Sequence, residues 1–348
     1  MLYDHLSDLS VEIEGYDLHR NERETSSGFT RVTTTVSLHG EDETGHGEDV
    51  TYDANEHDTF HRASSLSITG QFTLTEFSDM IGDLDLFFGS RPEQSVFWNY
   101  RRWAFESAAL DLGLKQTGVN LAERLNRECD PVRFVVSTRL GDPPTGDRIL
   151  NWLERDSSLE FKLDPTSDWT DETVSLLANT NAVRVLDLKG QYHGTTVDQS
   201  ADPDLYRRII DGFPEALIED PALTETTRPL FEGHEGRVTW DYPIRSVETV
   251  ERLPWEPAWI NIKPSRFGSV QALFDTIEYC LNNGIQMFGG GQFELGVGRG
   301  HLHALASLFY PDAPNDIALK EYNDPTPSSG LPSSPLVPPS EQQGFSWK

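Results

Sequence analysis

Two kinds of hydrophobic pattern divide the chain near residue 130. In residues 29–52, β-branched residues alternate with polar ones and Gly-rich acidic turns interrupt the run, which predicts a small antiparallel sheet. Apolar residues at helical spacing follow over residues 74–88 and 95–118. The first 130 residues are therefore expected to form an α+β domain.

From residue 131 onward, short apolar runs alternate with amphipathic segments. The runs predict eight strands, at residues 132–137, 159–163, 183–187, 216–219, 237–241, 258–263, 285–288 and 316–319. Between them, segments such as residues 269–283 place apolar residues on one face at the helical period. Strands that alternate with helices imply right-handed crossovers and a parallel sheet, and eight such strands favour closure into an α/β barrel.

The segment 321–348 is rich in Pro and Ser, which excludes a regular helix or strand there. It ends in a Gly-Phe-Ser-Trp sequence with two aromatic side chains that a solvated tail would not need. We therefore expect three parts: residues 1–130, a barrel over residues 131–320, and a C-terminal segment, residues 321–348, that packs back on the first part.

The composition of the chain narrows the classes of partner that it is expected to bind. The chain has 28 Lys and Arg against 57 Asp and Glu, a formal charge of −29, which argues against nucleic acid or an anionic membrane as a partner. The acidity is spread along the chain and fits a salt-rich cytoplasm. Cys129 and Cys280 suggest neither a disulfide framework nor a zinc site. No run of 18 apolar residues occurs, so a cytoplasmic protein is expected.

Charged residues stand where the predicted barrel strands end. Asp187, Glu219 and Asp241 end three consecutive strands, and Lys162 and Lys263 end the strands on either side. In such a barrel the active site lies at the C-terminal ends of the strands, so these side chains share one mouth. Three bare carboxylates would repel one another, and Mg²⁺, which prefers oxygen ligands, would relieve that cost. The lysines are placed to move a proton at a carbon next to a metal-bound carboxylate.

This set of charges, together with residues 106–125 and 289–308, resembles the enolase superfamily. The lysine pair resembles its muconate lactonizing enzyme subgroup, within the mandelate racemase/muconate lactonizing enzyme family, which includes muconate cycloisomerases, dipeptide epimerases and o-succinylbenzoate synthases. The resemblance covers nearly the whole chain. It implies a modified TIM-type (β/α)7β barrel that carries Mg²⁺ and an α+β capping domain that closes over the substrate.

The resemblance also implies roles for single residues. The three strand-end acids match the metal ligands, Lys162 matches the second lysine of a Lys-x-Lys motif, and Lys263 matches the lysine after strand six. Glu294 matches the glutamate that follows strand seven, and it is expected with Arg266 and Lys189 among the substrate-binding residues.

Two residues depart from the family pattern. Glu160 stands where the motif has its first lysine, and Lys189 stands where strand three of the family usually carries an asparagine. Either the pocket serves a more anionic substrate or the chemistry differs. Taken alone, Asp187 and Lys189 would be read as an ordinary strand-end ion pair. His301 and His303 stand two apart in a predicted helix and do not share a face, so they are interpreted as helix-start or packing residues rather than acid/base groups.

The resemblance implies a Mg²⁺-dependent enzyme that abstracts the proton alpha to the carboxylate of a small substrate and forms a metal-stabilised enediolate. An o-succinylbenzoate synthase-like dehydration is the first hypothesis, and dipeptide or N-acyl amino acid epimerisation and cycloisomerisation are alternatives. A hypothesis of another class, suggested by Glu160 and Lys189, is a catalytically silent barrel that binds a metal or a carboxylate. A homo-oligomer is expected in either case.

Overall fold

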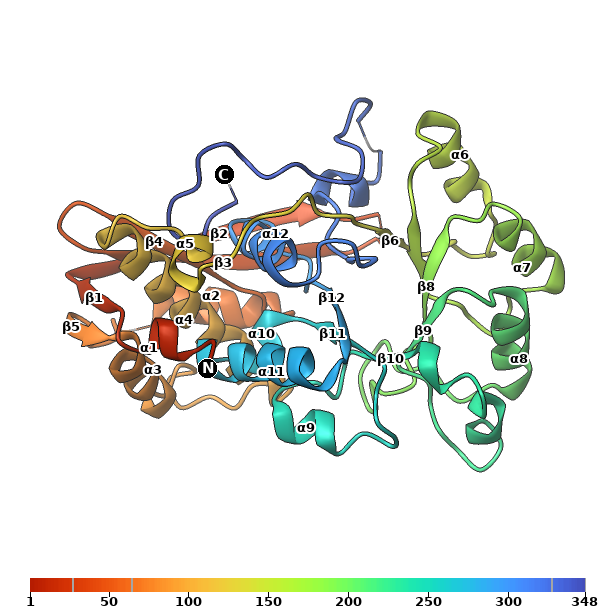
Figure 1. Cartoon of the computed structure of the whole chain (residues 1–348), viewed down its shortest axis with the longest axis horizontal. Helices are drawn as coiled ribbons and strands as arrows, with labels where there is room; N and C mark the ends of the chain where they lie inside the picture. The colour runs from red at the N-terminus through yellow and green to blue at the C-terminus, as the bar shows by residue number, and fades with distance from the viewer. Residues whose placement is uncertain (27, 64, 327, 348) are drawn as a thin grey trace.

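Two regions lie side by side in the computed structural model, which describes residues 1–26, 28–63, 65–326 and 328–347 (Figure 1). The N-terminal strands and helices lie at one end. Helices α6 (Asp147–Arg155), α7 (Asp171–Ala178) and α8 (Pro203–Gly212) lie at the other. The C-terminal segment, in dark blue, runs back over the N-terminal region.

The N-terminal region is an α+β cap. In it, β2, β3 and β4 form an antiparallel sheet, and β1 pairs with β5. The strands are β1 (Ser10–Ile13), β2 (Gly15–Glu24), β3 (Thr30–His39), β4 (Thr44–Asp49) and β5 (Gly70–Thr73). The helices are α1 (Asp4–Ser7), α2 (Ala54–Arg62), α3 (Leu74–Asp83), α4 (Val96–Gln116) and α5 (Leu121–Leu125).

Helix α4 is the centre of the cap. Strand β4 lies against it so closely that a Cβ at Gly47 would stand 1.9 Å from the carbonyl oxygen of Ala104, so only glycine fits there. Helix α3 begins with a capping box, in which the Thr73 hydroxyl accepts from the Glu76 backbone and the Glu76 carboxylate accepts from the Thr73 backbone. The helical patterns over residues 74–88 and 95–118 thus correspond to α3 and α4.

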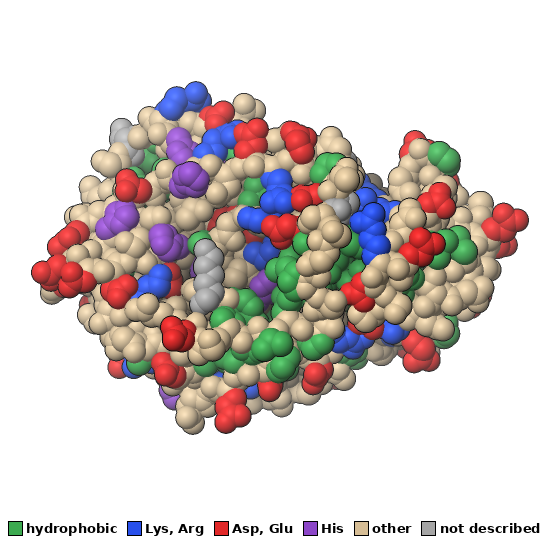
Figure 2. Space-filling model, turned by 90° about the horizontal axis from the view of Figure 1, so that it is seen from above, with side chains coloured by type: hydrophobic (Ala, Val, Ile, Leu, Met, Phe, Trp, Pro, Cys, Tyr) green, Lys and Arg blue, Asp and Glu red, His purple; other side chains and the backbone are tan. Residues whose placement is uncertain are grey.

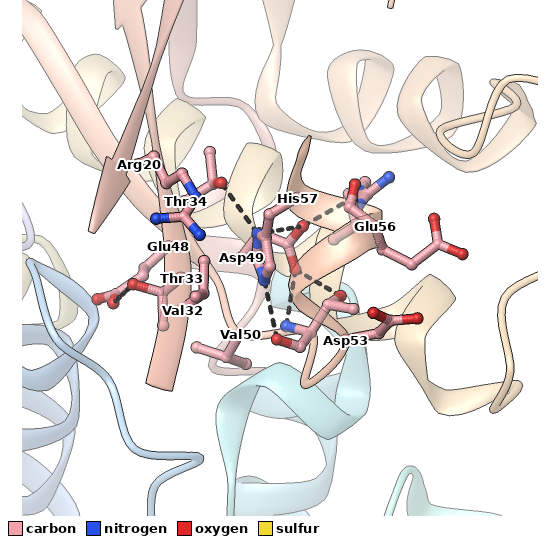
Figure 3. A network of polar contacts seen from close by, with 12 residues as sticks. Arg20, Val32, Thr33, Thr34, Glu48, Asp49, Val50, Asp53, Glu56 and His57 are labelled. Carbon is pink, nitrogen blue, oxygen red and sulfur yellow. Dashed lines mark hydrogen bonds and ion pairs between the residues drawn. The ribbon is translucent and has the colours of Figure 1, made fainter. Parts of the chain in front are cut away.

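A buried charge network holds β4 to α4 and α2 (Figure 3). Arg101 Nε donates to Asp49 Oδ2 at 2.8 Å, and the backbone and hydroxyl of Thr51 donate to Asp49 Oδ1 at 2.9 and 2.7 Å. The His57 ring lies beside them, between Thr34 and the Thr51 carbonyl. Burial would raise the pKa of Asp49, but Arg101 and His57 outweigh it and the pKa is lowered. Both carboxylate oxygens of Asp49 thus accept hydrogen bonds within this network.

The second region is built on a parallel sheet of seven strands, which in the described residues run in the order β12, β11, β10, β9, β8, β7, β6. The strands are β6 (Val136–Thr138), β7 (Phe161–Leu163), β8 (Val183–Asp187), β9 (Leu217–Glu219), β10 (Val238–Trp240), β11 (Trp259–Ile262) and β12 (Gln286–Gly289). The further helices are η1 (Arg228–Phe231), η2 (Glu235–Arg237), α9 (Val247–Glu251), α10 (Pro264–Phe267), α11 (Val270–Asn283), α12 (Gly298–Phe309) and η3 (Lys320–Asn323). The predicted fold class, a modified barrel with an α+β cap, is confirmed.

The predicted eighth strand, residues 316–319, is wrong as a regular strand. Among the described residues, isolated parallel bridges remain there, from Asn315 to Phe134, which precedes β6, and from Asp316 to Gly290, which follows β12. The chain leaves the sheet directly afterwards because side chains of α12 take its carbonyl groups. His303 Nε2 bonds the Ile317 carbonyl at 2.8 Å, and Arg299 donates to the Ala318 carbonyl.

The C-terminal segment touches both regions. Phe345 is fully buried, its ring stacked on His301 of α12 at 4.1 Å between centroids and set edge-on to Trp103 of α4 at 6.4 Å. Its backbone N–H donates to Asp111 Oδ1 at 2.8 Å. Within the described part of the chain, no helix is long and apolar enough to cross a membrane.

Candidate active site

Three carboxylates meet at the C-terminal ends of the central strands. Asp187 ends β8, Glu219 ends β9 in direct register with it, and Asp241 follows the last residue of β10. All three side chains are fully buried, and one oxygen from each lies within 4.8 Å of the others. The residues predicted as metal ligands are therefore brought together.

The two predicted catalytic lysines flank the carboxylates. Lys162 Nζ, from β7, lies 3.3 Å from Asp187 Oδ2 and forms an ion pair with Glu219. Lys263 Nζ, which follows β11, lies 2.8 Å from Asp241 Oδ2. Both lysines are buried, so each ammonium group depends on these carboxylates for its compensation.

The buried charged groups of the site differ in how their surroundings shift their pKa values. Burial, with Asp187 and Asp241 nearby, raises the pKa of Glu219 to about 7 against the attraction of Lys162. Burial would also raise the pKa of Asp241, but Arg266 and Lys263 outweigh it and hold that pKa well below its usual range. Burial would lower the pKa of Lys162, yet attraction by Glu219 and Asp187 raises it well above the usual value.

The donor set fits Mg²⁺. Oδ1 of Asp241 is buried and accepts no hydrogen bond from any described residue, although a buried carboxylate oxygen is normally satisfied. All three candidate ligands are hard carboxylate oxygens, which is the ligand type that Mg²⁺ prefers. Asp187, Glu219 and Asp241 are therefore the residues that would hold the ion.

A cavity of about 500 Å³ opens in front of this cluster. Its wall includes Lys162, Lys263 and Arg266 from the barrel and Phe29 and Tyr52 from the cap. Figure 2 shows Lys and Arg side chains gathered at the hollow between the larger body and the lobe beside it, while Asp and Glu side chains are scattered over the rest of this face. The cavity thus lies between the two regions and concentrates positive charge.

Two of the three predicted substrate-binding residues line the cavity. Arg266 Nη2 lies 3.2 Å from Asp241 Oδ2, and Lys189 forms an ion pair with Asp187. Glu294 is not among the described residues that line it. Its Oε1 accepts the backbone N–H of Gln292 at 2.8 Å, behind the loop that forms the wall. Its role in binding substrate stays a prediction.

Glu160 does not act as an extra acid against the proposed base. Arg133 donates to both of its oxygens, at 2.6 and 2.8 Å, and Arg184 donates to Oε1 at 2.6 Å. Burial would raise the pKa of Glu160, but the two guanidinium groups outweigh it and the pKa is lowered. In the part of the chain that the structure describes, the ion-pair partners of Lys162 are Asp187, Glu219 and Asp316.

Two polar residues of the site were not predicted from the sequence. The hydroxyl of Tyr192, in the loop after β8, donates to Asp241 Oδ2 at 2.6 Å. Asp316 Oδ2 lies 3.2 Å from Lys162 Nζ. Tyr192 could not be predicted in this way, because it lies in a loop and does not end a predicted strand. Asp316 was predicted to begin a strand, whereas the active site of such a barrel lies at the C-terminal ends of its strands.

Comparison with known proteins shows the family. Models of the domain of unknown function DUF8230 match residues 4–124 with its N-terminal domain and residues 128–324 with its C-terminal domain. The chain belongs to the DUF8230 family.

Other relatives of this DUF8230 protein are o-succinylbenzoate synthases. It is 38% identical over 123 residues to the one from Listeria innocua, across 33% of this chain and 32% of that protein. It is 26% identical over 228 residues to the one from Bacillus subtilis, across 61% of this chain and 57% of that protein. The chain therefore spans less than two thirds of either relative.

Solved structures share the fold. An enolase superfamily member from Listeria innocua is 20% identical, with a TM-score of 0.64, over 89% of this chain and 86% of that one. A dipeptide epimerase from Methylococcus capsulatus, complexed with a Mg ion, is 17% identical, with a TM-score of 0.66, over 87% and 89%. The DUF8230 protein thus has the fold of the enolase superfamily, as the strand-end charges predicted.

Proposed function

We propose that this DUF8230 protein is a Mg²⁺-dependent enzyme that removes the proton alpha to the carboxylate of a small substrate. One observation carries the proposal. Three buried carboxylates stand at the ends of three successive strands, between two buried lysines that line a cavity. Among the described residues, Oδ1 of the buried Asp241 has no hydrogen-bond donor, which suits a cation as its partner.

Each group has a distinct task. Mg²⁺ held by the three carboxylates would supply positive charge that stabilises the negative charge developing on the substrate carboxylate. Lys162 is the base on one side of the substrate carbon, and Lys263 is the acid, second base or cationic stabiliser on the other. Lys162 accepts a proton only when the negative charge of Asp187 and Glu219 is compensated, because burial alone lowers the pKa of a lysine.

For the overall reaction we propose an o-succinylbenzoate synthase-like dehydration, which the names of the curated relatives support. Dipeptide or N-acyl amino acid epimerisation and cycloisomerisation are the alternatives. They begin with chemistry at the same carbon, so lysines on both sides of the carboxylates suit them as well.

Solvent deuterium exchange tests the proton abstraction. Candidate carboxylates, including N-acyl amino acids, dipeptides and the precursor of o-succinylbenzoate, are incubated with the protein in D₂O with and without Mg²⁺. We expect Mg²⁺-dependent exchange at the alpha carbon, and Lys162→Ala should slow it by about 10² to 10⁴-fold. Lys320→Ala, which changes a lysine outside the cavity, is the matched control. Full turnover by Lys162→Ala on the true substrate would refute the role of Lys162.

Calorimetric titration with Mg²⁺ separates this proposal from a barrel that serves only in binding. The intact protein should bind Mg²⁺ and Asp241→Ala should not. Failure of the intact protein to bind Mg²⁺ would overturn the enzymatic proposal. Mg²⁺ binding without exchange on any carboxylate would favour the silent barrel.

A further inference from the structure

The side chain of Lys189 lies in the active-site cavity although no step of the proposed reaction uses it. We infer that Lys189 binds a second acidic group of the substrate, so that the site selects dicarboxylates over monocarboxylates. The inference rests on the proposed function, because it assumes that a first carboxylate of the substrate lies at the metal.

The backbone directs Lys189 into the cavity. Its φ of 54° is in the left-handed region, which non-glycine residues rarely adopt. The turn is held by the Lys189 N–H, which donates to Asp187 Oδ1 at 3.1 Å, and by the Gly190 N–H, which donates to the Asp220 carbonyl at 2.8 Å. Gly190 packs so closely that a Cβ there would lie 2.2 Å from the backbone N of Ala222. The loop is therefore fixed, and Lys189 is held inside instead of extending to solvent.

The ammonium group of Lys189 has two carboxylate partners of different kinds. One is Asp187, a candidate metal ligand, whose Oδ2 also lies 3.3 Å from Lys162 Nζ. The other is Asp164, which lines the cavity and whose Oδ1 lies 3.5 Å from Lys189 Nζ. Asp164 is already engaged, because Arg139 Nε donates to its Oδ2 at 3.0 Å.

These contacts change once a cation occupies the three carboxylates. A divalent ion held by the three carboxylates would compete with the Lys189 ammonium for Asp187, since like charges repel each other. Lys189 then depends on Asp164, which it shares with Arg139. Two cations, both lining the cavity, face a single carboxylate, and a buried cation in that position calls for an additional anion.

The surroundings of the Lys189 ammonium group favour a charged group of the substrate over water as its partner. Lys189 is only partly exposed, with a side-chain exposure of 13%, and its Nζ lies 5.3 Å from the centroid of the Tyr192 ring. In such a partly dehydrated place a charge-assisted hydrogen bond contributes more than a surface ion pair does. A carboxylate that reaches this wall while another lies at the metal is therefore the ligand that the charges favour.

Binding of matched acids tests the inference. Calorimetry in the presence of Mg²⁺ compares glutarate, adipate and pimelate with the monocarboxylates of equal chain length. We expect the wild-type protein to bind at least one dicarboxylate roughly tenfold more tightly than its monocarboxylate. Lys189→Met should remove that preference, whereas Lys189→Arg should keep it. Lys320→Met is the control for loss of a lysine elsewhere.

The outcomes separate the inference from the proposed function. If Lys189→Met keeps Mg²⁺ binding and the wild-type midpoint of thermal unfolding but also keeps the dicarboxylate preference, the inference is wrong. A wild-type protein without that preference is equally decisive against it. In both cases Mg²⁺-dependent exchange at the alpha carbon would leave the proposed function standing. If no carboxylate binds in a Mg²⁺-dependent way, both fall.

Discussion

The cap and the barrel both bury carboxylates, but they satisfy them differently. In the cap, Oδ1 of Asp49 accepts two hydrogen bonds from Thr51, and Oδ2 accepts from Arg101. At the strand ends, Asp241 has an unpartnered oxygen and the pKa of Glu219 is raised. The first arrangement holds two elements together. The second leaves a buried carboxylate oxygen without a hydrogen-bond donor among the described residues, which suits the cation site that we propose.

The cap network should respond most strongly to mutation. Asp49→Ala leaves the buried Arg101 guanidinium without its carboxylate, and we expect the free energy of unfolding to fall by about 3 to 5 kcal/mol. Urea denaturation measures the change. Asp58→Ala, which removes a partly exposed partner of Arg20, is the control and should cost about 0 to 1 kcal/mol. Equal losses in the two variants would contradict a structural role for the buried network.

The strand-end cluster should respond mainly in metal binding and less in stability. Glu219→Gln should weaken Mg²⁺ binding by more than about 100-fold, because even second-shell changes reach that size. Without metal at pH 8, the variant should lose less stability than Asp49→Ala, because it relieves the repulsion of Glu219 by Asp187 and Asp241 but also removes a partner of the buried Lys162. The folded-state pKa of Glu219, about 7, lies above that of an unfolded glutamate, so the ionised wild-type side chain opposes folding at this pH.

Calorimetry and urea denaturation in EDTA measure these two effects. Glu172→Gln, on the exposed surface of α7, is the matched control and should change neither. A metal-free Glu219→Gln protein that is several kcal/mol less stable than the wild type would place the cluster in the same class as the cap network.

Acid should reveal a third, smaller effect from histidines that are buried outside the active site. Burial lowers the pKa of His301 and of His303 to about 4, whereas an unfolded histidine titrates near 6.5. The unfolded chain binds more protons in this window, so the stability is complete above about pH 6.5 and is lost as the pH falls towards 4. At pH 5 each histidine should cost about 2 kcal/mol relative to neutral pH.

Urea midpoints at pH 7.5 and pH 5 measure that loss. His301→Leu should reduce the pH dependence of stability, and the exposed His193→Gln should leave it unchanged. An unaltered pH dependence in His301→Leu would show that this histidine does not resist protonation in the folded protein.

The strand-end acids could be predicted because a parallel barrel places the ends of successive strands together. Residues that end consecutive strands in the sequence therefore lie close together in the fold. Other parts could not be read in this way. The eighth strand was predicted but does not form as a regular strand, and His303 and Arg299, from a helix, bond carbonyl groups that a strand would have used. The direction of Lys189 depends on a positive φ, and Glu160 is compensated by arginines on neighbouring segments. Those contacts are set by tertiary packing, which the hydrophobic pattern does not encode.

The position of Phe345 has a consequence for the order of folding during synthesis. Its ring covers Trp103, which is made 242 residues earlier, and this contact cannot form before residue 345 has emerged from the ribosome. Until then α4 lacks part of its apolar cover, even though the rest of the cap has long been synthesised. Such a contact between distant parts of a sequence forms late, so Phe345 joins α4 to α12 only after the sequences of the cap and the barrel have been made.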